Sequence, residues 1–282
     1  MDIITDPYAL QAQCLAWRQQ NVRVGLVPTM GYFHRGHLSL MDAARGQADK
    51  VVVSLFVNPT QFGPNEDLAK YPRDLERDRA LAEEHGVDLL FAPETSAMYP
   101  PGDDTRVEVP TLARGLCAKS RPVHFAGVAR VVTKLLNLVQ PHVAVFGQKD
   151  WQQLAIIRRL VTDLFLPVTI LGHEIVREPD GLALSSRNVY MTPEERAQAP
   201  GLQRGLQSAR ALVSAGERSA TAVREHILAY YAANVPAGRV DYVEIVHPES
   251  LEPLVEIGPA ALAAVAVQLG RSRLLDNLLL TP

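Results

Sequence analysis

Segments with the character of strands and of helices alternate over the first two-thirds of this chain of 282 residues. VRVGLVPT (22–29), VVVSLFVNP (51–59) and VAVFG (143–147) are nearly continuous apolar runs, as expected of strands that are covered on both faces. Because parallel strands need crossover connections, which are usually helices, the alternation predicts an α/β fold with a parallel sheet. The other members of the series are predicted helices at 37–48, 74–85, 124–141 and 150–164 and predicted strands at 87–93 and 168–171.

The pattern changes after about residue 180. Thr192, Pro193 and Glu195 form a typical helix start, with an N-cap hydroxyl, a proline at the first position and a glutamate at the third. We expect one helix from there to about residue 215, a second helix at about 219–233, and then strands at 240–247 and 262–270. Helices followed by strands predict a smaller α+β domain, joined to the first near residues 174–182. The chain length also favours about two domains.

Composition excludes several classes of protein. The 28 Lys and Arg residues against 31 Asp and Glu residues give a net charge of −3, which is not the basic footprint of a protein that mainly binds nucleic acid. Cys14 and Cys117 are too few for a disulfide scaffold or a four-thiolate zinc site, and we expect both to be buried and unpaired. The chain starts without a signal-peptide pattern, and its apolar runs are shorter than the ~20 residues that span a bilayer. We therefore expect a cytoplasmic protein with neither a membrane nor a nucleic-acid partner.

The sharpest local signal is His34-Arg35-Gly36-His37, which follows the first strand and begins the first helix. Ligands of open α/β sheets bind at the carboxyl ends of strands, and free N–H groups at a helix start attract phosphate. Histidines at positions i and i+3 can both face such an anion. The tetrapeptide has the form of the nucleotide-binding signature of the nucleotidylyltransferase and class I synthetase superfamily. The competing interpretations are a chance match with solvated histidines, and a zinc site, for which we find no third and fourth ligand.

Three other polar segments could carry chemistry. Phe146 to Gln153 passes from a strand to a helix, and its Lys149 could stabilise charge on a phosphate. Asn58 to Phe62 offers uncharged amides directly after a buried strand. Leu184 to Arg187 resembles a degenerate form of the mobile Lys-Met-Ser-Lys-Ser loop of adenylate-forming enzymes, although a polar hairpin is the simpler interpretation. We predict that all four segments lie at strand ends on one rim of one sheet, which argues for a ligand site.

Taken together, these segments resemble the pantothenate synthetase (pantoate–β-alanine ligase) family over essentially the whole chain. The resemblance implies ATP-dependent condensation of pantoate with β-alanine through a pantoyl-adenylate, with release of AMP and pyrophosphate. It also implies Mg²⁺, a homodimer, a Rossmann-like domain at 1–176 that binds nucleotide and pantoate, and a lid domain at 177–282. The segments that carry it are Pro28–Gly31, His34–His37, Phe56–Pro59, Gln61–Gly63, Lys70–Asp74, Val131–Leu135, Phe146–Asp150, Gln152–Gln153, Ser185–Asn188 and Arg273–Asn277.

The resemblance also implies roles for individual residues. His37 is the expected proton donor, with His34 and Lys149 as further catalytic groups. Gln61, Gln153 and Asn58 are expected to bind pantoate, and Gln61 is also expected beside β-alanine; the residues that would hold Mg²⁺ are unassigned. The expected ATP site consists of Met30, Gly31, Tyr32, Phe33, His34, Arg35, Gly36, His37, Gly147, Gln148, Lys149, Asp150, Val176, Leu184, Ser185, Ser186 and Arg187.

Three positions depart from the family pattern. Ala126 stands where a polar or charged residue is expected, Thr60 where Met is frequent, and Gln148 where Glu is frequent. Thr60 and Ala126 bear on pantoate affinity. Two other functions compete with the ligase. A nucleotidylyltransferase would transfer the nucleotide to a phosphate acceptor, for which basic side chains suit better than amides; a non-catalytic nucleotide sensor would not need both Lys149 and the Ser185–Arg187 segment.

Overall fold

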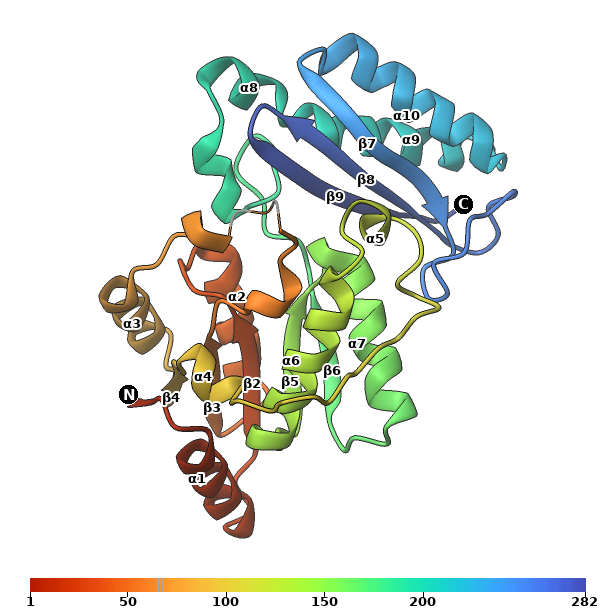
Figure 1. Cartoon of the computed structure of the whole chain (residues 1–282). Helices are drawn as coiled ribbons and strands as arrows, with labels where there is room; N and C mark the ends of the chain where they lie inside the picture. The colour runs from red at the N-terminus through yellow and green to blue at the C-terminus, as the bar shows by residue number, and fades with distance from the viewer. Residues whose placement is uncertain (65, 67) are drawn as a thin grey trace. The chain divides into compact units, whose positions relative to one another are not determined.

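The computed structural model describes residues 1–64, 66 and 68–282. The chain divides into two compact units, coloured by residue number in Figure 1. Unit 1 comprises Met1–Ala113, Arg121–Gln148 and Ile156–Glu174, and unit 2 comprises Arg114–Ser120, Lys149–Ala155 and Ile175–Pro282.

Unit 1 is built on a six-stranded sheet in the order β1-β4-β3-β2-β5-β6, in which all paired strands are parallel. The predicted α/β fold with a parallel sheet is confirmed. The central strands are the apolar runs found in the sequence, and their burial on both faces explains why they do not alternate with polar residues. The strands are β1 (Asp2–Ile4), β2 (Val24–Thr29), β3 (Lys50–Leu55), β4 (Leu89–Phe91), β5 (Val143–Gly147) and β6 (Thr169–His173).

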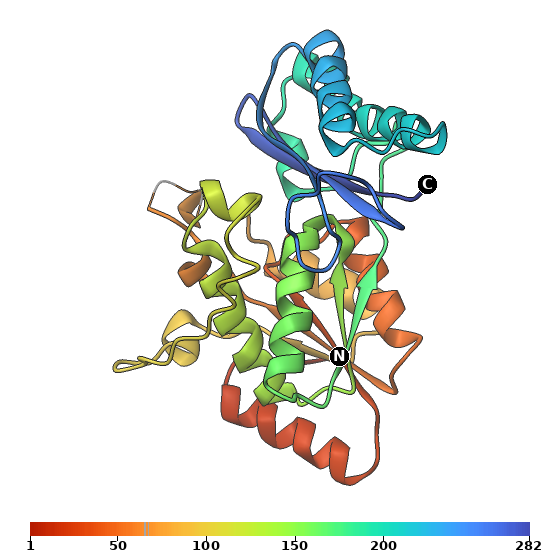
Figure 2. The ribbon, with the colours of Figure 1, turned by 90° about the vertical axis from the view of Figure 1, so that its right-hand side faces the viewer.

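Helices cover both faces of this sheet, as Figure 2 shows. Helix α2 (Arg35–Arg45) packs on β2, β3 and β5, and α3 (Leu75–Glu84) packs on α2. Helix α1 (Pro7–Gln19) packs against α6 (His124–Val139), which contacts β2. The remaining helices of this part of the chain are α4 (Thr95–Met98) and α7 (Trp151–Asp163), with short 3₁₀ helices η1 (Pro59–Gln61), η2 (Leu68–Lys70) and η3 (Gln148–Asp150).

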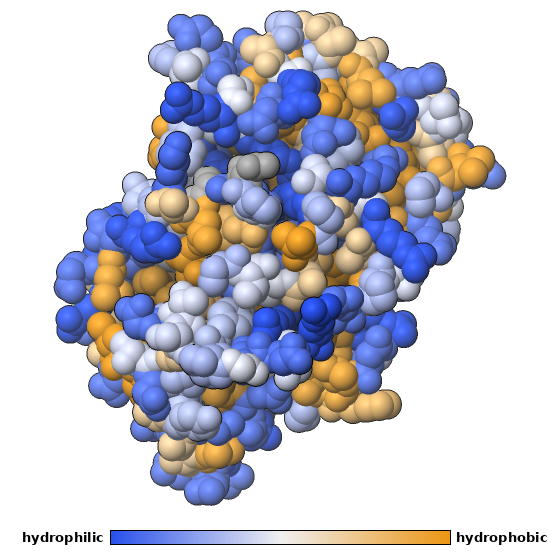
Figure 3. All heavy atoms as spheres, in the orientation of Figure 1, coloured by the Kyte–Doolittle hydropathy of each residue, from blue (hydrophilic) through white to orange (hydrophobic). Residues whose placement is uncertain are grey.

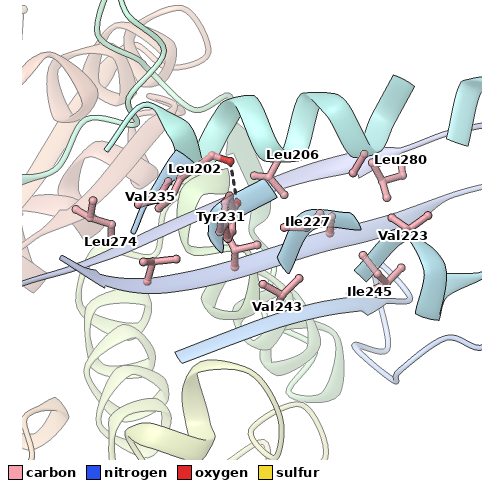
Figure 4. Close-up of a cluster of buried hydrophobic side chains, with 14 of the residues drawn as sticks. Leu202, Leu206, Val223, Ile227, Tyr231, Val235, Val243, Ile245, Leu274 and Leu280 are labelled. Atoms are coloured by element: carbon pink, nitrogen blue, oxygen red, sulfur yellow. Dashed lines mark hydrogen bonds between the residues drawn. The ribbon is translucent and has the colours of Figure 1, made fainter. Parts of the chain in front are cut away.

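Unit 2 is built on a three-stranded antiparallel sheet in the order β7-β8-β9. Its core lies between this sheet and two long helices, where the hydroxyl of Tyr231 donates to the carbonyl of Leu202 at 2.8 Å (Figure 4). The predicted α+β character is confirmed. The elements are α5 (Cys117–Ser120), η4 (Ser186–Tyr190), α8 (Pro193–Gln198), α9 (Gly201–Ser214), α10 (Ala220–Asn234), β7 (Gly238–Val246), β8 (Ala261–Leu269) and β9 (Ser272–Leu280).

Two expectations about the elements were wrong or incomplete. The single helix expected from Thr192 to about residue 215 is two helices, because Pro200 lacks the N–H that a continuous helix needs there. Strand β9 was not predicted, since Asp276 and Asn277 interrupt its apolar pattern.

Both cysteines are free and buried, as predicted, and burial raises the pKa of the Cys14 thiol to about 12. On the face drawn in Figure 3, hydrophilic residues cover much of the surface and hydrophobic residues lie among them in smaller groups. Within the described parts of the chain, no helix combines the length and the apolar character needed to cross a membrane.

Candidate active site

The loop from β2 to α2 makes a tight left-handed turn. Gly31 has a φ of +83° and Tyr32 a φ of +53°, which is an uncommon conformation for a residue with a side chain. A Cβ atom on Gly31 would also lie 3.0 Å from a carboxylate oxygen of Asp78, which is a tight contact, so both conformation and space favour glycine. The turn is closed by that carboxylate: its two oxygens accept the backbone N–H groups of Tyr32, at 2.5 Å, and Phe33, at 2.7 Å.

Helix α3 thus holds this loop through its first turns. Asp78 is fully buried, and Arg77 beside it donates to the carbonyl of Phe33 at 2.9 Å. The Arg77 guanidinium also lies 5.2 Å from the centre of the Tyr32 ring, a cation–π distance. Burial raises the pKa of Asp78, while the two N–H donors and Arg77 act in the opposite direction. The loop is held by a buried charge-assisted network of the kind that gives backbone a single arrangement.

The two histidines of the His-x-Gly-His motif form the N-terminal cap of α2. Nδ1 of His34 accepts the N–H of Gly36 at 3.1 Å, and Nδ1 of His37 accepts the N–H of His34 at 3.4 Å. The rings stack with their centres 4.1 Å apart. Because each Nδ1 is an acceptor, the proton of each neutral imidazole lies on Nε2. The helix start therefore presents two imidazoles whose donor atom is Nε2.

Polar residues after β3 form a buried network around Gln61. The amide nitrogen of Asn58 donates to Oε1 of Gln61 at 3.0 Å, and Nε2 of Gln61 lies 3.0 Å from the sulfur of Met30. Oδ1 of Asn58 accepts from the hydroxyls of Thr60, at 2.9 Å, and Tyr99, at 2.8 Å. The bond from Asn58 assigns the oxygen and nitrogen of the Gln61 amide. Asn58, expected to bind pantoate, thus orients Gln61, and an expected ATP residue, Met30, lies next to an expected pantoate residue.

The first turns of α6 contact the network around Gln61 through Gly127 and His124. The carbonyl of Gly127 accepts a second hydrogen bond from the Asn58 amide at 3.1 Å, and a Cβ atom on Gly127 would lie 2.4 Å from the carbonyl oxygen of Thr60. Glycine is therefore required for this close approach. Nδ1 of His124 is 3.0 Å from the carbonyl of Gln61. Asp78, Tyr99 and His124 support site residues without having been predicted.

Strand β5 leads into the third expected segment. Gly147 ends the strand, and Nε2 of Gln148 donates to the carbonyl of Gly172 in the neighbouring strand at 3.3 Å. Lys149 and Asp150 follow in η3 and belong to unit 2. Gln153 is half-buried in the first turn of α7. Since β3, β2 and β5 are adjacent in the sheet, three of the four expected segments follow neighbouring parallel strands.

The fourth segment was expected at a strand end of the same sheet, and this was wrong. Leu184–Arg187 lies in unit 2 and follows a short turn that folds on itself: the N–H of Leu184 donates to the carbonyl of Val176 at 3.0 Å, and Arg177 pairs with Ala183. These backbone bonds lie within unit 2, and the segment does not directly follow a strand of the parallel sheet. Ser185 then caps η4 by accepting the N–H of Arg187 at 3.3 Å.

Sequence comparison decides the family. The family model for pantoate-beta-alanine ligase matches residues 2–279. The chain belongs to this family. A pantothenate synthetase of Maridesulfovibrio salexigens is 61% identical over 280 residues, which are 99% of each chain.

Solved structures of ligases from this family have the same fold. The pantothenate synthetase of Thermus thermophilus is 49% identical with a TM-score of 0.94, and the match covers 100% of both chains. The pantoate–β-alanine ligase of Francisella tularensis, whose crystal structure is described as complexed with beta-gamma ATP and β-alanine, is 31% identical with a TM-score of 0.78. That match covers 99% of this chain and 97% of the other. The predicted family and its ligase reaction, the condensation of pantoate with β-alanine, are confirmed.

Proposed function

We propose that this ligase works in two half-reactions, with ATP activating the carboxylate of pantoate. In the first, a carboxylate oxygen attacks the α-phosphorus in line, the bond from that phosphorus to the bridging oxygen of the β-phosphate breaks, and pyrophosphate leaves. In the second, the amine of β-alanine attacks the carbonyl carbon of pantoyl-adenylate, loses a proton, and displaces AMP. Activation is needed because a carboxylate itself is a poor electrophile for an amine.

The observation that carries the proposal is the histidine pair at the start of α2. Nδ1 of His34 and of His37 is engaged by backbone N–H groups, so each ring offers Nε2–H as its donor. Such donors, combined with the N-terminal end of a helix, suit the charge that develops on the phosphates as pyrophosphate leaves. We assign His37 as the proton donor and His34 as its partner on the phosphates, within an ATP site at 30–37. Lys149 and the Ser185–Arg187 segment are proposed to add positive charge and hydroxyl donors.

Pantoate is proposed to bind through Gln61 and Gln153. The hydrogen bond from Asn58 holds Oε1 of Gln61, so that Nε2 is the donor, and a neutral N–H donor suits both a hydroxyl and a carboxylate oxygen. Gln61 is also proposed to lie beside β-alanine. Burial of Asn58 and Gln61 favours exclusion of water, which would otherwise hydrolyse the adenylate between the two half-reactions.

Magnesium is proposed to enter with the nucleotide. Among the residues that the structure describes, no group of three or more His, Cys, Asp or Glu side chains could hold a metal ion, and both oxygens of Asp78 already accept backbone N–H groups. Mg²⁺ is commonly bound through substrate phosphates and water with few protein ligands. A site with few carboxylates is therefore compatible with Mg²⁺ that arrives bound to ATP. When bound, the ion would neutralise phosphate charge; the assignments above concern only the chain's own groups.

The family resemblance supports three further proposals. We propose that residues 1–176 bind the nucleotide and pantoate, that residues 177–282 provide a lid that carries Leu184–Arg187, and that two chains associate in the cytoplasm as a homodimer. Light scattering tests the association: a dimer has a mass of about 62 kDa, twice the 30.9 kDa of one chain. A mass of one chain at micromolar concentration would contradict it.

A product assay tests the proposed reaction. With MgATP and pantoate but no β-alanine, we expect about one equivalent of pyrophosphate per site; added β-alanine should give steady release of pyrophosphate and AMP in equal amounts. Pyrophosphate release that needs no pantoate, or release of ADP, would overturn the proposal. The nucleotidylyltransferase alternative predicts pyrophosphate only with a phosphate-bearing acceptor, and the sensor alternative predicts none.

A further inference from the structure

Strand β9 of unit 2 carries three buried polar side chains. Ser272, Asp276 and Asn277 are 0%, 4% and 6% exposed, and they interrupt a strand that is otherwise rich in leucine. A buried polar group costs free energy unless it is hydrogen-bonded, so the partners of these side chains show what they do. Two of the three lie in the Arg273–Asn277 motif, to which the proposed reaction assigns no role.

Asn277 contacts the lysine of the proposed ATP site. Its Nδ2 donates to the carbonyl oxygen of Lys149 at 3.0 Å. Lys149 lies in η3, a single 3₁₀ turn whose own hydrogen bonds constrain the chain weakly. A part-buried side-chain bond to the Lys149 carbonyl restrains the rotation of the peptide that follows it, and thereby the direction in which the lysine side chain leaves the backbone.

Ser272 contacts the second proposed ATP segment of unit 2, and Asp276 contacts the turn before it. The hydroxyl of Ser272 donates to the carbonyl of Arg187 at 2.8 Å. Asp276 accepts two hydrogen bonds from the guanidinium of Arg177, at 2.7 and 2.8 Å, and Arg177 also donates to the carbonyl of Gly181 at 3.1 Å. The carboxylate thus braces the turn that leads into Leu184–Arg187. Oδ1 of Asp276 further accepts the N–H of Asn277, at 2.8 Å, which couples the two residues.

We propose that β9 is the positioning strand of the ligase site, in which Asn277 orients Lys149 and Ser272 orients Arg187. This inference rests on the proposed roles of Lys149 and Arg187. Neither Asn277 nor Ser272 is a catalytic residue in this account, because each acts through the backbone of another residue. The polar residues of this otherwise apolar strand are thus explained by their bonds to the backbones of Lys149 and Arg187.

The test is a mutant cycle with steady-state kinetics on the full chain. Asn277→Ala should lower kcat by about 10- to 100-fold, because small misplacements of a charged group are costly in a positioned site, while KM for β-alanine should stay within about twofold. In a Lys149→Ala background the same substitution should have no further effect, since a residue that acts through Lys149 has nothing left to position. Asn277→Leu, which has a similar volume and no N–H donor, should reproduce the loss if Asn277→Ala folds poorly.

Tyr231→Phe is the matched control, because it also removes a buried side-chain donor to a backbone carbonyl in unit 2, and the acceptor residue, Leu202, belongs to neither segment. It should lower Tm about as much as Asn277→Ala and leave kcat within about twofold. Asn277→Ala with wild-type kcat, or a loss that multiplies with that of Lys149→Ala, would overturn the inference. If Lys149→Ala itself retains wild-type turnover, the proposed role of Lys149 fails instead. The same cycle is repeated for the second contact with Ser272→Ala, alone and in an Arg187→Ala background. Wild-type kcat in Ser272→Ala, or a loss that multiplies with that of Arg187→Ala, would overturn this part of the inference.

Discussion

Residues 30–37 of unit 1 and residues 184–187 of unit 2 are two of the stretches that we propose to act on ATP, and they are held by different means. The first is anchored by the fully buried carboxylate of Asp78 and is capped by its own histidines. The second is a half-buried 3₁₀ turn, braced at Arg187 by the hydroxyl of Ser272 and at Asn188 by the carbonyl of Ala183.

The two segments differ in how far their conformations are fixed before substrate binds. A buried charge with two backbone donors cannot be moved without leaving polar groups unpaired, so the first segment is preorganised. The bonds that the second segment itself makes are neutral and lie at a half-exposed turn, so they can be exchanged for water at little cost. The buried pair of Asp276 and Arg177 braces only the turn before it. We therefore expect substitutions at the supports of the first segment to reduce both stability and catalysis, and those at the supports of the second to act mainly on catalysis.

The largest effect is expected from removing one proposed catalytic group in each unit. His37→Ala in unit 1 and Lys149→Ala in unit 2 should each lower kcat by about 10²- to 10⁴-fold, because each removes a donor or charge that acts on the phosphates in the transition state. Circular dichroism and Tm should stay close to wild type. His85→Ala is the control: this histidine pairs with Asp42 at an exposed site and should leave turnover unchanged. Near-wild-type kcat in either site variant would refute its assigned role.

The second prediction compares the carboxylates that support the two segments. Asp78→Asn should destabilise the chain by about 2–4 kcal/mol and lower kcat/KM for ATP by about 100-fold, since one backbone N–H loses its buried acceptor. Asp180→Asn in the turn before Leu184 removes an exposed bond to Arg196 and should cost under about 1 kcal/mol. Urea unfolding and ATP kinetics of both variants measure the contrast. Equal costs would show that the two segments are not held differently.

The third prediction tests the pantoate side of unit 1. Gly127→Ala places a Cβ atom against the backbone of Thr60 and Gln61, so it should cost about 1–3 kcal/mol and raise KM for pantoate several-fold more than KM for ATP. Gly46→Ala is the matched control in the same unit, because its Cβ would meet only ordinary contacts and its backbone is helical. An unchanged KM for pantoate in Gly127→Ala would mean that the Asn58–Gln61 network does not position this substrate.

The smallest effect is a difference in acid response. The hydrogen bond from Arg196 lowers the pKa of Asp180, so its stabilising contribution is present above the ordinary value of 3.8 and is lost as pH falls through the folded-state pKa. Burial raises the pKa of Asp78, so its contribution has the opposite sign: it is present below 3.8 and is lost as pH rises through the raised pKa.

The two tryptophans allow each unit to be followed separately, because Trp17 lies in unit 1 and Trp151 in unit 2. In single-tryptophan chains unfolded by urea between pH 3 and 6, Asp180→Asn should reduce the loss of stability on acidification reported by Trp151. Asp78→Asn should reduce the loss on raising pH reported by Trp17. Changes of the same sign for both substitutions would contradict the assigned shifts.

Local patterns in the sequence predict part of this architecture well. Strands β2, β3 and β5 are apolar runs, and the His34–His37 motif lies at a strand-to-helix junction, so both are visible within a few residues of chain. The supports of the site are not. Asp78 is 46 residues from Tyr32, and nothing near it in the sequence shows that its carboxylate closes that turn. Its one signal is helical: with Ala82, four residues later, it makes up the buried side of α3.

The errors have the same origin. Leu184–Arg187 was expected at a strand end because a polar stretch in an alternating chain commonly lies there, yet backbone bonds within its own turn place it in unit 2. Strand β9 was missed because its polar residues interrupt the apolar pattern. Those residues are polar because they hold Arg187 and Lys149, which are 85 and 128 residues away in the chain. The residues that hold a site in place act through contacts between distant parts of the chain, and these contacts cannot be predicted from the local hydrophobic pattern.

The most direct test of the central claim follows an oxygen atom. Pantoate labelled with ¹⁸O in its carboxylate is turned over with MgATP and β-alanine, and the AMP and pyrophosphate are examined by mass spectrometry. If the carboxylate attacks the α-phosphorus at the site built on His34 and His37, one ¹⁸O atom appears in the phosphate of each AMP and none in pyrophosphate. AMP without the label, in a reaction that still forms the amide, would contradict activation through pantoyl-adenylate.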